Sequence, residues 1–111
     1  MYNKITLIGN IGKDAELSYT PTGAPMTRFN VAVKSGYGDK ERTAWISCTL
    51  FGKLAEALDG FLTKGKLVYV EGELYPGENG NPRAYEKKDG KYAASYEVTV
   101  KEVKLLGKKG D

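Results

Sequence analysis

The sequence predicts an all-β fold: a small closed barrel of five strands with one short helix. Most segments of the 111-residue chain alternate apolar and polar residues, as strands with one face in a core do. Residues 53–63 have apolar residues at helical spacing instead. Glycines at positions 9, 12 and 72 fit strands that curl to close a barrel. A chain of this length forms one domain, which we place at residues 1–107.

The first strand is predicted at residues 4–9 and ends at a turn signal in residues 10–12. We expect residues 16–19 to continue the same strand after a bend, as glycine-broken strands do at barrel corners. The sequence Thr-Pro-Thr-Gly at residues 20–23 then favours a turn.

The second strand, residues 26–34, alternates regularly and predicts Phe29, Val31 and Val33 on the core side. Its outward side is basic and otherwise carries small residues: Arg28, Asn30, Ala32 and Lys34. Residues 35–42 form a hairpin loop, in which Tyr37 stands between two glycines. Because little of the chain can pack around Tyr37, its position favours contact with a ligand.

The third strand, at residues 43–51, carries the most informative pattern. One face is wholly apolar and reads as core, with Ile46, Cys48 and Leu50. The other face holds two large aromatic residues separated by small polar ones, Trp45, Ser47, Thr49 and Phe51, with Lys53 just beyond. This second pattern is typical of surfaces that stack nucleobases. The alternative is a strand of a two-sided sandwich, in which both aromatic side chains are buried.

A helix of about three turns is predicted at residues 53–63, with Gly65 as its C-cap. Its apolar side would contain Leu54, Leu58, Phe61 and Leu62. The fourth strand follows at residues 67–74. We expect Val68 and Val70 to point into the barrel, so Leu67 and Tyr69 lie on the opposite face of the strand.

Residues 73–90 are rich in glycine and proline, which predicts a long excursion from the barrel with residues 83–85 at its centre. The last strand is predicted at residues 92–106. Alternate positions of this strand are occupied by apolar or aromatic residues: Tyr92, Ala94, Tyr96, Val98 and Val100. Three strands, a helix and two strands is the element order of the OB-fold, a five-stranded Greek-key barrel with its helix between strands three and four.

Composition argues against catalysis. The chain has no histidine, which removes the commonest general base and metal ligand, and it has no Walker-type loop. Its one cysteine, Cys48, cannot form an internal disulfide or a thiolate zinc site, so we expect an inert core thiol. We therefore predict neither an enzyme nor a cofactor nor a metal site.

No apolar run approaches the roughly 20 residues of a membrane helix, and no secretory signal precedes the first strand. We expect no membrane partner and a cytoplasmic, nucleoid-associated protein. The net charge of +3 is compatible with a nucleic-acid partner without requiring one.

Five motifs together resemble the bacterial single-stranded DNA-binding protein family. They occur in the family's order and spacing at residues 3–12, 20–23, 44–45, 50–56 and 64–72. The resemblance extends over residues 3–106. It implies an OB-fold, a homotetramer wrapped by single-stranded DNA, and no catalysis. The function so implied is largely sequence-independent binding and protection of single-stranded DNA in replication, recombination and repair.

The resemblance also assigns roles to single positions. Trp45 and Phe51 match the family's base-stacking aromatics, and Tyr37 and Tyr85 stand where the family has tryptophans in two long loops. Arg83 and Lys53 match basic positions near the DNA backbone, to which the pattern of the second strand adds Arg28 and Lys34. Ile46 stands where many relatives have a histidine at a subunit contact. With Leu67 and Tyr69, it forms the expected oligomer interface.

Family members usually continue into a glycine-rich segment and an acidic tip that recruits replication and repair proteins. This chain ends instead in the short basic segment 108–111, so we expect such partners only through a tail beyond it. Two alternative functions use the same barrel: a primosomal accessory or RNA-binding module, and a protein-interaction domain whose aromatic face contacts a partner.

Overall fold

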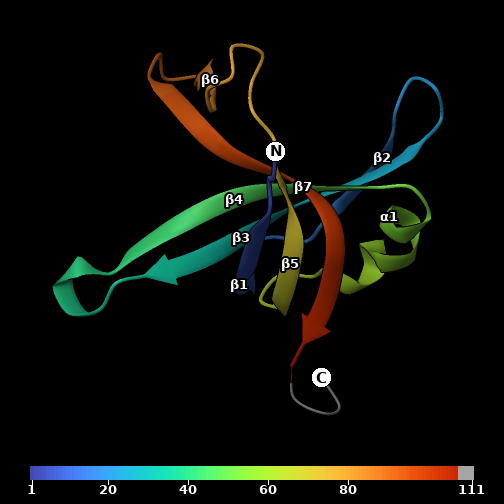
Figure 1. Cartoon of the computed structure of the whole chain (residues 1–111), viewed down its shortest axis with the longest axis horizontal. Coiled ribbons are helices and arrows are strands. Elements are labelled where there is room, and N and C mark those ends of the chain that lie inside the picture. Colours follow the sequence, from blue (N-terminus) through green and yellow to red (C-terminus); the bar gives the residue numbers. More distant parts are fainter. Residues whose placement is uncertain (108–111) are drawn as a thin grey trace.

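The computed structural model describes residues 1–107 and shows a barrel from which several hairpins extend, two of which we call arms (Figure 1). Seven strands are present: β1 (Ile5–Ile11), β2 (Glu16–Tyr19), β3 (Pro25–Ser35), β4 (Arg42–Phe51), β5 (Leu67–Leu74), β6 (Arg83–Glu86) and β7 (Tyr92–Leu106). The helical segments are η1 (Gly38–Lys40), α1 (Lys53–Leu58) and η2 (Asp59–Phe61). The basic end predicted at residues 108–111 lies outside the described residues.

The sheet closes into the predicted five-stranded barrel. Its order is β1-β5-β7-β4-β3-β2, and an additional pairing between β1 and β3 completes the ring. β4 and β7 run parallel, whereas the other neighbours are antiparallel. With the helix between β4 and β5, this arrangement is consistent with the OB-fold.

β1 and β2 together form the first barrel strand, as the sequence predicted. Ile11 pairs with Val31 and Glu16 pairs with Arg28, so both segments lie along β3. The register shifts between them, which marks the bend. The turn predicted at residues 10–12 is wrong, however, because β1 continues through Ile11, whose side chain is 2% exposed in the core.

The core lies inside the barrel and confirms the inward faces predicted for β3 and β4. Phe29, Val31, Cys48 and Leu50 are all buried. The remaining apolar core comes from all around the ring: Leu7, Ile11, Ile46, Ala55, Leu62, Val68, Val70, Val98 and Val100. Thr27 is buried as well, and its hydroxyl donates a 2.8 Å hydrogen bond to the carbonyl of Ala55. That bond links β3 to α1 without leaving a polar atom unpaired.

The helix is shorter than the sequence predicted. α1 ends at Leu58 and tightens into the 3₁₀ turn η2, so the helical spacing no longer applies at Phe61. Leu54 and Phe61 are exposed, while Leu62 and Ala55 enter the core. Gly65 is not a C-cap of this helix. It lies in the turn before β5, where its N–H donates to the carbonyl of Ile11 at 2.7 Å.

The alternating residues of the last strand do not form one continuous buried face. Val98 and Val100 are buried, but Tyr92 and Tyr96 on the same face of β7 are exposed. The first half of β7 has left the barrel and pairs with β6, which forms one of the two arms (Figure 1). The other arm is the hairpin of β3 and β4, and it explains why Val33 is only partly buried. None of the helices in the described part of the chain is long and apolar enough to cross a membrane.

Two glycines allow barrel strands to approach closely. A Cβ at Gly9 would lie 2.2 Å from the carbonyl oxygen of Ala32, and one at Gly72 would lie 2.2 Å from that of Thr99. Neither contact could be relieved by turning a side chain, because both neighbours are backbone. The close contacts confirm the prediction that Gly9 and Gly72 lie where strands curl to close the barrel.

We predict that Gly72→Ala destabilises the fold by about 1–3 kcal/mol or more, because the added methyl forces β5 and β7 apart. Chemical denaturation measures the free energy of unfolding. Gly60→Ala is the matched control, since a Cβ there meets nothing within 4 Å. An equal loss of stability in both variants would contradict the close-approach argument.

Candidate nucleic-acid interface

The outward face of β3 and β4 exposes the two aromatic residues singled out by the sequence. Trp45 lies opposite Ala32, and Phe51 lies opposite Met26 at the other end of the pair. Their side chains are 56% and 49% exposed. The sandwich alternative, which requires both rings to be buried, is therefore wrong for this barrel.

The arm formed by β6 and β7 adds a second set of side chains to the same face. Arg83 pairs with Ser95, and Tyr85 pairs with Ala93. β7 then carries this face into the barrel, where Glu97 lies beside Ser47 of β4. The guanidinium of Arg83 is 5.6 Å from the centre of the Tyr85 ring, a cation–π distance that keeps the charge next to the aromatic plane.

Three of the open grooves on this surface are lined by exposed aromatic side chains. The first, of about 340 Å³, lies between Trp45 and Tyr85 and is also lined by Arg83. The second, of about 260 Å³, lies between Phe51 and Tyr75 and is also lined by Arg28.

The third groove, of about 760 Å³, lies between the other two. It shares Arg83 with the first groove, and Tyr75 and Glu97 with the second. A continuous path of paired aromatic and basic side chains results. We call this surface the aromatic face and define it by Trp45, Phe51, Tyr75, Tyr85, Arg28 and Arg83.

Sequence reasoning missed Tyr75. It follows the end of β5, is 61% exposed, and its N–H donates to the carbonyl of Glu97 at 2.8 Å, which fixes it beside β7. The available signal was an aromatic residue directly before a proline, Pro76, at the start of the long excursion. Nothing in the local pattern showed that the loop would bring it opposite Phe51.

Three expected binding residues lie outside the grooves. Tyr37 is 88% exposed at the tip of the β3–β4 arm, beside η1. Lys34 lies on the same arm opposite Thr43, and Lys53 is exposed at the start of α1. All three face solvent and line none of the grooves, although Lys34 lies on the same outward side of β3 as Arg28 and next to Ala32, the partner of Trp45.

Trp45 rests against a glycine. A Cβ at Gly12 would lie 2.4 Å from Cζ3 of the indole, so the ring lies directly over this backbone position. Gly12 also lies at the bend between β1 and β2, where its N–H donates a 3.1 Å hydrogen bond to the carbonyl of Asn30 on β3, as the prediction of a curling strand requires. Because Gly12 has no side chain, its backbone leaves room for the indole of Trp45 to pack against it, while more than half of the Trp45 side chain stays exposed.

The outward surface of β1, β5 and β7 is a second candidate surface, which we call the β5 face. Tyr69 and Leu67 point outward from β5, and Ile8, 55% exposed, lies opposite Tyr69 on β1. Ile46, in contrast, is only 6% exposed in the core, so its side chain offers little surface to a partner.

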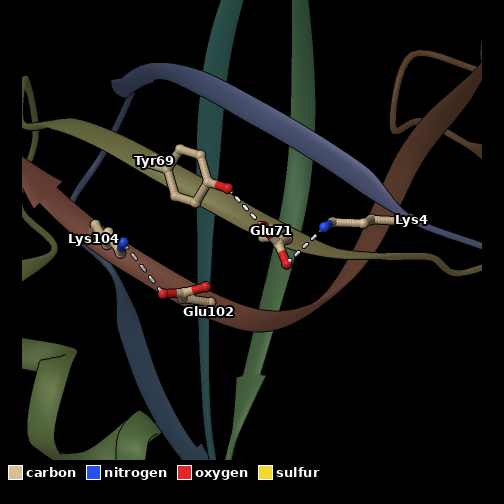
Figure 2. Close-up of polar contacts among 5 residues, drawn as sticks. All are labelled: Lys4, Tyr69, Glu71, Glu102 and Lys104. Carbon is tan, nitrogen blue, oxygen red and sulfur yellow. Dashed lines mark hydrogen bonds and ion pairs between the residues drawn. The ribbon is translucent and has the colours of Figure 1, made fainter.

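Charged groups surround Tyr69 on the β5 face (Figure 2). Its hydroxyl donates a 2.6 Å hydrogen bond to Glu71, and Lys4 lies 3.2 Å from the other oxygen of that carboxylate. These two donors hold the pKa of Glu71 below its ordinary value, whereas the hydrogen bond raises the pKa of Tyr69. Lys104 lies 5.8 Å from the Tyr69 ring centre and 3.6 Å from Glu102.

Within residues 1–107 no cluster of three or more potential metal ligands occurs. Burial raises the pKa of the Cys48 thiol to about 12, so it stays protonated and unreactive at neutral pH.

A family model described as the single-strand binding protein family matches residues 2–106. A single-stranded DNA-binding protein of Neisseria meningitidis serogroup A is 38% identical over 110 residues, covering 95% of this chain and 60% of the relative. Single-stranded DNA-binding protein 1 of Xylella fastidiosa is 37% identical over 115 residues, covering 98% and 80%. For the single-stranded DNA-binding protein of Xanthomonas campestris pv. campestris, identity is 37% over 114 residues, covering 98% and 63%. The chain thus spans about three fifths of the length of several relatives it matches.

We predict that Gly12→Ala displaces the indole of Trp45 with little loss of stability, because the clash involves the far end of a half-exposed side chain. Trp45 is the only tryptophan, so a shift in its emission maximum and in its quenching by acrylamide reports the movement directly. Gly60→Ala, where a Cβ meets nothing within 4 Å and φ is not positive, is the control for the fluorescence readout. Unchanged emission in Gly12→Ala would show that the position of the indole does not depend on its contact with Gly12.

Proposed function

The chain belongs to the single-strand binding protein family, and from this premise we propose that it binds single-stranded DNA along the aromatic face without catalysing a reaction. The family is named for binding rather than catalysis, in agreement with the expectation that the chain is not an enzyme. We further propose that this binding protects unpaired DNA during replication, recombination and repair in the bacterial cytoplasm.

One observation carries the mechanism: Trp45 and Tyr85, from strands 40 residues apart in the sequence, line the same open groove. Every base has an aromatic plane, so exposed rings bind unpaired bases with little dependence on sequence. Phe51 and Tyr75 repeat the arrangement in a second groove. A flexible single strand could stack successive bases on these four aromatic side chains, because they lie along one face.

Basic side chains on the same face would contact the DNA backbone. Arg28 is exposed beside the Phe51 groove, and Arg83 lies between the two aromatic pairs. Such side chains neutralise phosphates and release counterions, which makes binding sensitive to salt. A duplex hides the planes of its bases and could not use the aromatic platforms, so this arrangement supports selectivity for unpaired strands.

We also propose that the chain forms a homo-oligomer, with a tetramer as the form implied by the family resemblance, through the β5 face. Ile8, Leu67 and Tyr69 gather apolar surface there, and the charges of Glu71 and Lys104 flank it. β1 adds to this surface. Its pairing with β3 is confined to Asn10 and Ile11, so most of the strand has only β5 as a described neighbour. An apolar centre with a polar rim is the usual form of a subunit interface.

We predict that a poly-dT oligonucleotide quenches the emission of Trp45 and that Trp45→Ala or Tyr85→Ala each weakens binding by about 1–3 kcal/mol. Titrations at two salt concentrations measure affinity and its salt dependence, with tyrosine emission or anisotropy of a labelled strand used for the Trp45 variant. Tyr92→Ala is the matched control. It lies on the same arm, lines none of the three grooves, and points to the opposite face of β7 from Ala93, the partner of Tyr85.

Saturable, salt-sensitive binding would distinguish this function from a protein-interaction domain on the same barrel. If poly-dT does not bind at all, the aromatic face is a protein surface and the proposal is wrong. If all three alanine variants lose affinity equally, the binding path does not follow the aromatic face.

We predict that sizing in solution at micromolar concentration returns a particle several times the 12.1 kDa chain mass, because a monomer would leave Ile8, Leu67 and Tyr69 in water. Leu67→Glu should shift the particle to a smaller size, since a carboxylate at the centre of the interface would be desolvated without a partner. Leu54→Glu, at an exposed residue of α1, is the control. A wild-type particle of one chain would refute the proposed assembly.

A further inference from the structure

Glu97 places a carboxylate on the aromatic face, where its negative charge would repel the phosphates of a bound strand. Its side chain is only 15% exposed and lines both the Phe51–Tyr75 groove and the larger groove beside Arg83. A largely buried carboxylate costs free energy unless other groups of the protein pair with it. The contacts that Glu97 makes therefore indicate what it contributes to this surface.

The backbone of Glu97 is held by the barrel. The residue lies beside Ser47 in the parallel pairing of β4 and β7, and its carbonyl accepts a 2.8 Å hydrogen bond from the N–H of Tyr75. The arm starts directly before it, because the pairing of β6 with β7 ends where Arg83 lies opposite Ser95. Glu97 is thus a fixed point of the barrel at the base of the arm.

The side chain of Glu97 contacts the first residue of β6. Its Oε2 accepts a 3.0 Å hydrogen bond from the hydroxyl of Ser95, and Nη1 of Arg83 lies 3.9 Å from the same oxygen. The guanidinium of Arg83 lies in turn 5.6 Å from the centre of the Tyr85 ring. These contacts connect the barrel to the basic and aromatic side chains that the arm contributes to the aromatic face.

Arg83 is a side chain for which such a connection matters. It is long and 57% exposed, so by itself it would sample many rotamers. A flexible side chain loses this freedom when it is fixed on a ligand, and the loss weakens binding. A partner that already restricts the guanidinium in the free protein reduces that loss.

We propose that Glu97 is a positioning residue: its carboxylate holds the guanidinium of Arg83, and with it the ring of Tyr85, ready for single-stranded DNA. The chain then binds DNA more tightly with this negative charge than without it. Glu97 acts through Arg83 and makes no contact with the DNA itself. This proposal rests on the proposed single-stranded DNA binding.

Charge and positioning predict opposite results when Glu97 is replaced. If the carboxylate acts only through its charge, its loss reduces the repulsion of phosphates and strengthens binding. If it positions Arg83, its loss weakens binding, because the DNA must then fix a mobile side chain. Salt separates the two effects further. High salt screens the repulsion, whereas it does not remove the cost of fixing a side chain.

The experiment measures the affinity of the whole chain for a labelled oligo-dT at a low and a high salt concentration. Glu97→Met keeps the length of the side chain and removes both oxygens, and we expect it to weaken binding about fivefold at both concentrations. Glu97→Gln keeps one acceptor for the guanidinium and should weaken binding less.

Glu86→Gln is the matched control for charge. It removes the same charge from the same arm, but Glu86 is exposed and lines none of the three grooves. This variant should bind oligo-dT slightly more tightly than the wild-type chain at low salt and equally at high salt.

A double-mutant cycle with Arg83→Met tests whether Glu97 acts through Arg83. Arg83→Met alone should weaken binding. In the chain that carries Arg83→Met, the further change Glu97→Met should no longer weaken binding and should strengthen it slightly at low salt, because only the charge effect remains. A general disturbance of the fold would instead weaken binding by a similar factor in both backgrounds.

Each result decides a separate question. If the wild-type chain does not bind oligo-dT, the proposed function fails. If it binds, and Glu97→Met strengthens the binding or leaves it unchanged, single-stranded DNA binding stands and the positioning role of Glu97 is overturned. The role is overturned as well if Glu97→Met weakens binding equally with and without Arg83.

Discussion

The close backbone approach that closes the barrel is the constraint on which the rest of the structure depends. Gly9 lets β1 pass over the carbonyl of Ala32, and Gly72 lets β5 pass over that of Thr99. β1 can therefore pair with β5 along its length and with β3 at Asn10 and Ile11, and this second pairing closes the ring. With the ring closed, the inward side chains of every barrel strand share one core, and the outward side chains are sorted into distinct surfaces.

The two outward surfaces differ in a way that fits two kinds of partner. The aromatic face is grooved, and its rings alternate with arginines that have few fixed partners. A flexible polyanion with stackable bases matches such a surface. On the β5 face, the charged side chains are already paired with one another around an apolar centre. Paired charges attract a polyanion weakly, which is why we assign this surface to contacts between copies of the chain.

The local pattern of apolar and polar residues was sufficient to predict much of this structure. Alternation identified the core side of β3 and β4, and it placed Trp45 and Phe51 on the outward side, because strand geometry determines side-chain direction within a few residues. The order of the elements indicated the OB-fold. Pattern failed where contacts between distant segments decide the outcome. α1 ends early, at Leu58, and Tyr92 and Tyr96 are exposed because their half of β7 follows β6 out of the barrel. Tyr75 reaches Phe51, and Gly12 supports Trp45, only because loops and strands far apart in the chain meet in the folded barrel. By itself, then, the sequence determined which side chains are available on each strand, and the tertiary structure alone decided which of them meet.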